Sequence, residues 1–423
     1  MLTAIVGINW GDEGKGRMVD LLSESQDIIV RYQGGNNAGH TVVNERGKFI
    51  LNLLPSGILR ADKVNVMGGG MVVDIQHLAG EVARLREGGV EVTPDNLLIS
   101  DRATICFPYN VQQDCLEEDR LAARKFGSTR RGIAPIYADK YMKKAVRMGD
   151  LLHPDYLRSR VEDVLDWKNL CLGAYPGAKK YTVEEIMDWL AEYGERFKPY
   201  IRDVGAYLYD AAKAGKNIMF EAQLGALRDI DFGIYPYTSS SNTIAAYAPI
   251  GAGVPALKID KTVGIMKAYS SCVGEGPFTT EMFGEDAVAL REAGGEYGAA
   301  TGRPRRVGGF DVVASRYGCK VQGADEIALT KLDVLDGFDK IPVTDAYVVD
   351  GELVGEFPFG EKLNAAKPHT VMLDGWKTPT GKCRKFSDLP AAARAYIDYI
   401  EKSVDCELKY ISVGAERDSI IVR

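Results

Sequence analysis

Short runs of apolar and β-branched residues alternate along this chain with longer segments in which apolar residues recur at helical spacing. The short runs predict strands over 3–8, 27–32, 63–68, 217–221, 262–269, 326–331, 341–349 and 408–413. The longer segments predict helices over 15–24, 72–87, 110–125, 183–213, 283–293 and 388–402. Strands that alternate with helices are joined by crossovers, so the pattern predicts an α/β fold with a large, mainly parallel central sheet flanked by helices.

The first predicted strand, TAIVGI at 3–8, is almost entirely apolar, which is typical of a strand covered on both faces. In sheets of this kind, ligands bind on the loops at the carboxyl ends of the strands. No internal repeat or low-complexity linker divides the sequence. We therefore expect a single domain with insertions over residues 1–423.

The charge and the cysteine distribution disfavour several classes of protein. The formal net charge of −7 disfavours a general binder of nucleic acid or membrane surfaces, because such proteins carry a basic excess. The seven cysteines are scattered without a CxxC pair, which indicates free thiols rather than a zinc site or a disulfide framework. The start of the chain has no leader-like segment, and no apolar run is long enough to span a membrane. We expect a soluble, cytoplasmic protein.

The first candidate site is the loop INWGDEGKG at 8–16, between a predicted strand and a predicted helix. Its glycines let backbone N–H groups approach phosphate oxygens at a helix N-terminus, and Lys15 adds positive charge. The usual pattern GxxxxGK[ST] is not matched, because Asn9 replaces its first glycine and Gly16 replaces its Ser or Thr. A metal ion would need another oxygen ligand, for which Asp12 is the obvious candidate. Taken alone, the loop could equally be an ordinary strand–helix turn.

Two further loops follow predicted strands. The Gly/Asn-rich segment 31–41 holds His40, one of only four histidines, as a candidate acid or phosphate contact; a structural histidine is the alternative. The segment TKLD at 330–333 resembles the (N/T)KxD motif of GTP-binding proteins, in which the aspartate accepts hydrogen bonds from guanine. By itself it is a weak match that also occurs at chance strand ends. SVGA at 412–415 is a second candidate wall for the base.

A fourth candidate is the segment EYGAATGRPRR at 296–306, where three arginines stand beside Thr301 in glycine-rich sequence. Arginine side chains bind carboxylates and phosphates through two parallel hydrogen bonds. In an acidic protein, such a local cluster indicates an anionic substrate. A solvated basic loop is the alternative.

Taken together and in order, these segments resemble the adenylosuccinate synthetase family. The resemblance rests on NWGDEGKG (9–16), GGNNAGHT (34–41), GSTRRGIAP (127–135), EAQLGALRDID (221–231), TGRPRR (301–306), TKLD (330–333) and SVG (412–414). It covers nearly the whole chain, and so many ordered matches are far more specific than any one motif. The resemblance implies the P-loop-NTPase-like adenylosuccinate synthetase fold.

The resemblance also implies an activity. Members of this family are GTP-dependent ligases that join IMP and L-aspartate to form adenylosuccinate, with release of GDP and phosphate, in the first committed step of AMP synthesis. The 6-oxygen of IMP attacks the γ-phosphate of GTP, and the aspartate amine then displaces phosphate from 6-phosphoryl-IMP. Mg²⁺ is the implied cofactor, and a homodimer is the implied assembly.

By the same resemblance, each ligand has a set of implied contacts in this sequence. The implied catalytic residues are Asp12, His40 and Lys15, and the implied metal ligands are Asp12 and Gly39. The implied GTP contacts are Gly11, Glu13, Gly14, Lys15, Gly16, Arg17, His40, Thr41, Arg305, Lys331, Leu332, Asp333, Ser412, Val413 and Gly414. The implied IMP contacts are Asp12, Asn37, Ala38, Gly39, His40, Thr129, Lys143, Gln223, Ser239 and Arg303. The implied aspartate contacts are Ala299, Ala300, Thr301, Gly302, Arg303 and Arg305.

Several positions on the IMP side depart from the family pattern. Lys143 replaces an arginine that reaches the IMP phosphate of the neighbouring subunit, which keeps the charge but loses the guanidinium fork. The family's glutamine in EGAQG falls on Leu224, while Gln223 lies one residue earlier. One residue at a strand end turns a side chain to the other face, so either the loop is reshaped or this contact is lost. Ser239 stands where threonine is expected.

These departures leave two alternatives open. The first is the same chemistry on another purine monophosphate such as dGMP, although relatives of that kind change the loop aspartate and Asp12 is intact here. The second is a GTP-binding switch without ligase activity, which would bind guanine nucleotides with no dependence on aspartate. Asp12, His40 and the arginine segment argue against the switch.

Overall fold

The computed structural model describes residues 1–423 except 45–46, 299–301 and 303. Its centre is a ten-stranded sheet in the order β20-β19-β15-β11-β1-β10-β2-β5-β7-β9. These strands are β1 Leu2–Gly7, β2 Ile28–Arg31, β5 Val64–Met67, β7 Leu97–Ser100, β9 Ile201–Arg202, β10 Ile218–Glu221, β11 Lys261–Lys267, β15 Glu326–Thr330, β19 Glu407–Ser412 and β20 Ile420–Val422. Every neighbouring pair is parallel except β19 and β20, so the predicted α/β class with a mainly parallel sheet is confirmed.

Smaller sheets lie outside this one. β16 Lys340–Val349 pairs with β14 Phe310–Asp311, β17 Glu352–Val354 and β18 Lys367–Asp374. The remaining pairs are β3 His40–Asn44 with β4 Gly47–Leu51, β6 Val72–Val73 with β8 Thr104–Ile105, and β12 Ser270–Cys272 with β13 Arg306–Gly308. The predicted strand 341–349 therefore exists as β16, but it lies outside the central sheet.

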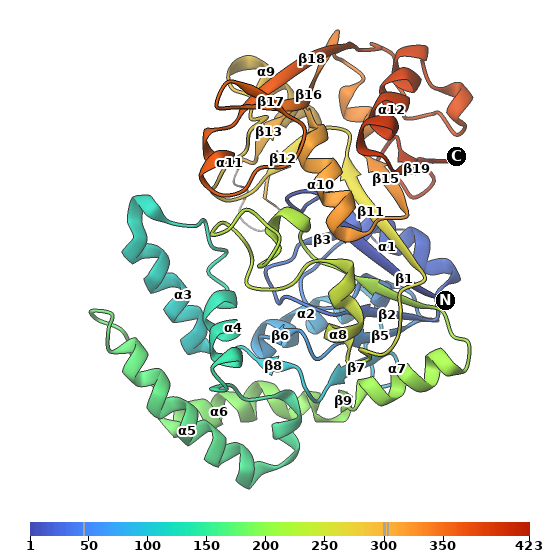
Figure 1. The fold of residues 1–423 in the computed structure, drawn as a ribbon. Coiled ribbons are helices and arrows are strands. Elements are labelled where there is room, and N and C mark those ends of the chain that lie inside the picture. Colours follow the sequence, from blue (N-terminus) through green and yellow to red (C-terminus); the bar gives the residue numbers. More distant parts are fainter. Residues whose placement is uncertain (45–46, 299–301, 303) are drawn as a thin grey trace.

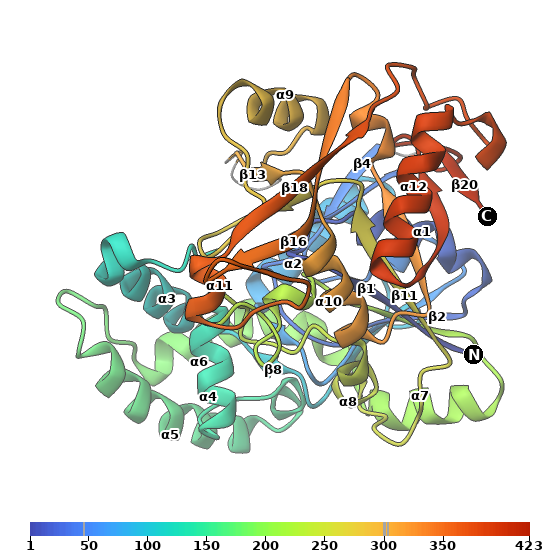
Figure 2. The ribbon, with the colours of Figure 1, turned by 45° about the horizontal axis from the view of Figure 1, so that its top comes forward.

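The α-helices are α1 Lys15–Leu22, α2 Ile75–Glu87, α3 Pro108–Leu121, α4 Ile133–Tyr141, α5 Pro154–Leu172, α6 Val183–Gly194, α7 Val204–Lys213, α8 Ala248–Ala252, α9 Gly284–Gly294, α10 Val312–Gln322, α11 Glu361–Ala365 and α12 Ala391–Val404. Figures 1 and 2 show α3, α4, α5 and α6 gathered on one side of the molecule, away from α9 and α12. No helix in the described part of the chain is both long and apolar enough to cross a membrane.

One predicted helix is wrong in its extent. The segment 183–213 forms α6, then a 3₁₀ turn over Glu195–Tyr200 and the short strand β9, and only then α7. Pro199 lies in the turn, where its missing N–H cannot continue an α-helical ladder. A new helix begins at α7 because the Asp203 side chain accepts a hydrogen bond from the Ala206 N–H at 3.0 Å.

The centre of the sheet explains where the site forms. All six residues of β1 are buried, and β1 lies between β10 and β11 in the sheet. The loops that follow β1, β10 and β2 therefore meet at one edge, together with the turns after β15 and β19. This edge holds most of the residues predicted to carry the chemistry.

Candidate active site

The loop after β1 contains two carboxylates with different surroundings. Glu13 is buried, and its Oε1 accepts hydrogen bonds from the backbone N–H groups of Asn9 at 3.1 Å and Gly11 at 2.7 Å. Its Oε2 lies 2.6 Å from the Lys15 Nζ, which is also buried. Glu13 therefore braces the glycine-rich loop from inside and holds the lysine in place.

Asp12 faces the other way. Its φ of 59° is left-handed, and its side chain is 35% exposed, whereas Glu13 is 2% exposed. Its Oδ2 lies 3.0 Å from the Arg305 Nε, an ion pair without hydrogen-bond geometry. Burial alone would lower the pKa of Arg305, but Asp12 and Glu296 raise it overall. The two neighbouring carboxylates thus differ in role: Glu13 stabilises the loop from inside the protein, and Asp12 is accessible to a ligand.

His40 begins β3 and is held from the neighbouring strands. Its Nδ1 lies 2.5 Å from Oε1 of Glu221, the last residue of β10. The Ser56 N–H donates to Glu221 Oε2 at 2.7 Å, and the Ser56 hydroxyl donates to Oε1 at 2.6 Å. Burial lowers the pKa of His40, and Glu221 opposes this shift only in part. Because an ionised carboxylate can only accept, Nδ1 carries the proton and Nε2 is left for a ligand.

The approach of His40 also explains why the loop ends in glycine. A Cβ placed on Gly16 would lie 2.9 Å from the Cβ of His40. The serine or threonine of the usual phosphate-binding pattern would therefore clash with this histidine. Gly16 is a packing requirement of the two loops that carry Asp12 and His40.

Two of the predicted IMP contacts, Gln223 and Asn37, contact each other directly. The Gln223 Nε2 donates to the Asn37 Oδ1 at 2.8 Å. Leu224 has a φ of 60°, a left-handed conformation that is uncommon for a residue other than glycine. The chain therefore turns sharply just after Gln223, whose side chain is bonded to Asn37.

The turns after β15 and β19 lie together on the opposite side of the loop. Lys331 has a φ of 59°, and its Nζ donates to the Gly294 carbonyl at 2.5 Å. Arg17, from α1, donates through Nη1 to the Ser412 hydroxyl and through Nη2 to the Ser419 carbonyl at 3.1 Å. Burial raises the pKa of Asp333, which Lys331 and Arg17 oppose. The candidate guanine contacts are thus gathered from three distant parts of the sequence.

Sequence reasoning missed Glu296 as a functional residue. Its buried carboxylate lies 2.7 Å from the Lys267 Nζ, 3.1 Å from the Lys331 Nζ and 2.8 Å from the Arg305 Nη1. The Tyr269 hydroxyl donates to it at 2.5 Å. Burial raises the pKa of Glu296, but the three cations outweigh burial and hold it well below its usual range. Burial lowers the pKa of Lys267 to about 8.

A signal for this cluster was present in the sequence. Lys267 lies inside a predicted strand of otherwise apolar residues, where a lysine is buried only when it is paired. Glu296 is the first residue of the segment that carries the three arginines. The Glu296 carboxylate thus connects Lys331, one of the predicted guanine contacts, with Arg305, which pairs with Asp12.

The remaining predicted ligand contacts are partly exposed, partly bonded within the protein and partly outside the described residues. Ala299, Ala300, Thr301 and Arg303 lie outside the described residues, and Gly302 is exposed with a φ of 64°. Thr129, Lys143 and Gly39 are exposed. The Ser239 hydroxyl lies 3.4 Å from that of Ser241, and the Ala38 carbonyl accepts from the Asn52 side chain at 2.6 Å.

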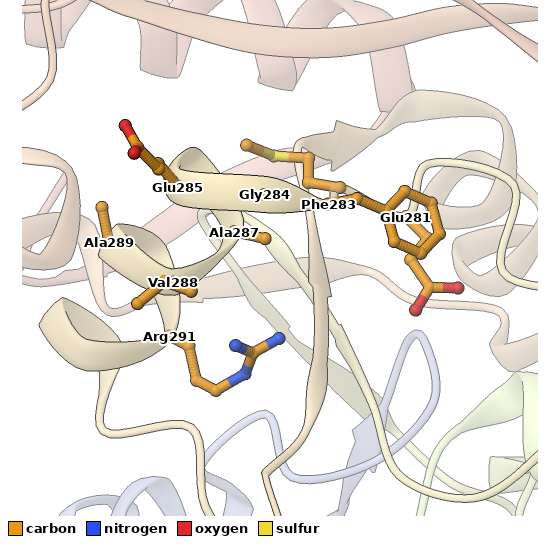
Figure 3. Close-up of a pocket in the computed structure, with 9 residues that line it drawn as sticks. Glu281, Phe283, Gly284, Glu285, Ala287, Val288, Ala289 and Arg291 are labelled. Atoms are coloured by element: carbon orange, nitrogen blue, oxygen red, sulfur yellow. The ribbon is translucent and has the colours of Figure 1, made fainter.

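A cavity of about 610 Å³ lies over α9, away from these residues. Its lining is mostly apolar and includes the exposed side chains of Phe283 and Val288 (Figure 3). Arg291 lines it and donates through Nε to the Arg305 carbonyl at 2.9 Å, so the cavity backs onto the arginine segment. It contains none of the predicted catalytic side chains.

A phosphate-binding loop and a guanine-type base motif at one edge of a parallel sheet define a GTP-dependent α/β enzyme. The comparisons with known proteins make the class specific. The chain belongs to the adenylosuccinate synthetase family, whose model matches residues 4–421. It is accordingly a GTP-dependent ligase that forms adenylosuccinate from IMP and L-aspartate.

Individual relatives agree. The chain is 44% identical over 422 residues to the adenylosuccinate synthetase of Caldanaerobacter subterraneus subsp. tengcongensis, covering 100% of this chain and 99% of that one. The fully ligated adenylosuccinate synthetase from Plasmodium falciparum has a TM-score of 0.92 at 34% identity, covering 100% and 99% of the two chains. A cyanophage S-2L succinoaminodeoxyadenylate synthetase bound to dGMP and dATP has a TM-score of 0.61 at 18% identity, covering 100% and 95%, and shows the fold alone. The predicted family and ligase activity are confirmed, and neither alternative is favoured.

Proposed function

We propose that Asp12, His40 and Lys15 carry the phosphoryl transfer between GTP and IMP. The observation that supports this most strongly is the pairing of an exposed Asp12 with a His40 oriented by Glu221, both at the edge where β1 and β10 end. Phosphoryl transfer depends mainly on positioning and on charge, and less on covalent help from the protein. Lys15 and the backbone N–H groups of the glycine-rich loop supply both at the GTP phosphates.

In the first step, Asp12 takes the N1 proton of IMP while the 6-oxygen attacks the γ-phosphorus of GTP. The bond between the γ-phosphorus and the β,γ-bridging oxygen breaks, and GDP leaves. His40 lies against the transferring phosphoryl group with its Nδ1 held by Glu221. Negative charge on the phosphates favours the protonated ring, whose Nε2–H then donates to that group. In the second step, the neutral aspartate amine attacks C6 and the bond between C6 and the former 6-oxygen breaks. Phosphate departs with that oxygen and with the proton lost by the amine.

The residues present fit the Mg²⁺ that the family generally needs. No group of three or more His, Cys, Asp or Glu side chains within the described ranges could hold a metal by itself. Mg²⁺ commonly takes one or two carboxylates and completes its shell with phosphates and water, which the single exposed Asp12 suits. Asp12 and the Gly39 carbonyl would hold it. When bound, it neutralises charge on the β- and γ-phosphates.

We assign the remaining ligand contacts from the positions of the residues in the fold. The turns after β15 and β19 are assigned to guanine, and they hold Lys331, Asp333, Ser412 and Gly414. Arg17 joins this group from α1 by donating to Ser412. Arg305 is assigned to aspartate; Thr301 and Arg303, which lie outside the described residues, are assigned to aspartate by their motif alone. Asn37, Thr129 and Ser239 are assigned to IMP, and Gln223 lies behind Asn37, to which it donates at 2.8 Å. These assignments rest on the motifs and on the positions described above.

Oxygen labelling tests the two-step route. IMP carrying ¹⁸O at C6 is incubated with GTP, L-aspartate and Mg²⁺, and the released phosphate is analysed by mass spectrometry. Attack by the 6-oxygen predicts that each phosphate carries one ¹⁸O from IMP. Unlabelled phosphate, with adenylosuccinate formed at the normal rate, would show that the 6-oxygen does not accept the phosphoryl group.

Asp333→Asn is expected to raise the KM for GTP by roughly 10- to 100-fold, because it removes a charged acceptor for guanine N1–H and the 2-amino group. Xanthosine triphosphate should then become a better substrate than GTP, because the asparagine amide can donate a hydrogen bond to the 2-oxo group of xanthine. Steady-state kinetics with GTP, ATP and xanthosine triphosphate measure the change. An unaltered preference for GTP would mean that TKLD is only a strand end.

We propose that the enzyme is a cytoplasmic homodimer in which Lys143 reaches the neighbouring site. Lys143 is exposed and has a φ of 63°, and it follows the exposed apolar side chains of Tyr141 (70%) and Met142 (51%). Exposed apolar side chains beside a charge are common at protein interfaces.

Mixed protomers test the shared site. Lys143→Ala and Asp12→Asn protomers should each be poorly active alone, whereas a refolded equimolar mixture should regain about a quarter of wild-type activity. Half of the dimers are then mixed, and one of their two sites is intact. The steady-state rate of adenylosuccinate formation measures the recovery. No recovery in demonstrably mixed dimers would place Lys143 outside the neighbouring site.

A further inference from the structure

Gln223 belongs to a buried chain of hydrogen bonds whose direction is fixed at one end. Gln223 and Arg31 are both fully buried, and the Arg31 Nη2 donates to the Gln223 Oε1. A guanidinium group has only donors, so the amide atom that faces it must be the oxygen. The Gln223 nitrogen is therefore directed away from Arg31, toward Asn37.

The orientation of the Asn37 amide follows from its hydrogen-bond donors in the same way. The Gln223 Nε2 donates to Asn37 at 2.8 Å, and the Gly35 backbone N–H donates to the same Asn37 atom at 3.1 Å. Two donors converge on that atom, so it must be Oδ1. Asn37 is only half-buried, and its Nδ2 donates to no acceptor within the described ranges. Its two N–H bonds are thus available to a ligand.

Backbone features make this arrangement possible. A Cβ on Gly34 would lie 1.4 Å from the Gln223 Nε2, so the amide occupies space that only glycine leaves open. The Gln33 side chain donates to the Gln223 carbonyl at 2.9 Å and holds the backbone at that point. The left-handed Leu224 then turns the chain immediately after Gln223. Gly34, Gln33 and Leu224 together thus fix the local structure around Gln223.

We propose that Gln223 is a positioning residue that locks the Asn37 amide with its NH₂ group toward the purine monophosphate. Asn37 then presents donors to an oxygen acceptor of the nucleotide, such as its phosphate. Gln223 itself does not contact the nucleotide, because Arg31 and Asn37 already occupy both ends of its amide. This inference rests on the proposed placement of IMP beside Asn37.

Gln223→Glu tests the lock, because the carboxylate still pairs with Arg31 but cannot donate to Asn37. The Asn37 amide should then rotate so that its NH₂ group donates a hydrogen bond to the new carboxylate instead of to the nucleotide. We expect the Kd and KM for IMP to rise roughly tenfold, with the KM values for GTP and aspartate changed by less than about twofold. Gln112→Glu makes the same chemical change on α3, where the side chain donates to the Lys179 carbonyl at 2.9 Å, and should leave IMP binding unchanged.

A double-mutant cycle separates positioning from direct contact. In an Asn37→Ala background, Gln223→Glu should cause no further loss of IMP affinity, because the group that it orients is gone. An equal loss in both backgrounds would overturn the proposal, since it would indicate direct contact or charge repulsion of the nucleotide. An unchanged IMP affinity in Gln223→Glu would overturn it as well. Thermal unfolding checks that each variant folds, and Gln223→Met replaces Gln223→Glu in the cycle if the latter does not.

Calorimetry with IMP alone gives the Kd without requiring turnover. Failure of the proposed function would appear as a wild-type chain that binds IMP but forms no adenylosuccinate with GTP and aspartate. Failure of the positioning role would appear as normal turnover with no coupling between Gln223 and Asn37. The two results are therefore distinguishable.

Discussion

Replacing Asp12 by asparagine is expected to lower kcat for adenylosuccinate formation by roughly 10³-fold, the usual size of a lost general base. The variant keeps the shape of the side chain but removes the charge that we propose takes the N1 proton and would hold Mg²⁺. Asparagine tolerates left-handed backbone as well as aspartate does, so the loop with its φ of 59° should keep its conformation. Pre-steady-state and steady-state rates at saturating substrates measure the loss.

A matched control uses Asp95, an exposed carboxylate just before β7. Residues that precede parallel strands lie at the opposite edge of the sheet from the site, so Asp95→Asn should leave kcat unchanged. Both variants should unfold within a few degrees of the wild-type protein. Retention of most activity in Asp12→Asn would remove this residue from proton abstraction.

Replacing His40 by asparagine is expected to lower kcat by roughly 10²- to 10⁴-fold, because it removes the donor to the transferring phosphoryl group. The amide nitrogen of asparagine takes a position close to that of Nδ1 and can still donate to Glu221, so the buried carboxylate keeps its partner. The KM values for GTP and IMP should change far less than kcat, since the contact strengthens only in the transition state.

His369 offers the control for this substitution. It is exposed on β18, and its Nδ1 lies 2.7 Å from Asp345, outside the loops of the site. His369→Asn should be as active as the wild-type protein. If the affinity of His40→Asn for GTP falls by as large a factor as kcat, His40 acts in binding rather than in catalysis.

Much of the fold follows from local pattern. The apolar runs of β1, β10, β11 and β15 are long enough and sufficiently free of polar residues to predict a parallel sheet buried on both faces. The segment 183–213 is harder, because its helical spacing of apolar residues continues through the Pro199 turn. Only tertiary packing shows that the chain there forms β9 at the edge of the sheet.

The site shows the same division. Asp12, Lys15 and His40 could be predicted because each lies in a short motif whose chemistry is local. The Glu296 cluster could not, because Lys267, Lys331 and Arg305 come from separate parts of the sequence and meet only in the folded chain.

The direction of the Gln223 side chain is a further case that the sequence leaves undecided. A residue's place at a strand end gives its face only while the backbone stays extended. The left-handed φ of 60° at Leu224 changes the path of the chain, and no composition rule predicts it for leucine. The contact of Gln223 with Asn37 therefore required the structure.

The most direct test of the account is an assay of product formation with each purine monophosphate in turn. IMP, GMP, AMP and dGMP are supplied separately with GTP, Mg²⁺ and L-aspartate, and both phosphate release and succinyl-purine formation are followed. We expect IMP to be the preferred substrate and the formation of both products to require aspartate. Turnover with dGMP but not with IMP, or GTP hydrolysis that is independent of aspartate, would contradict it.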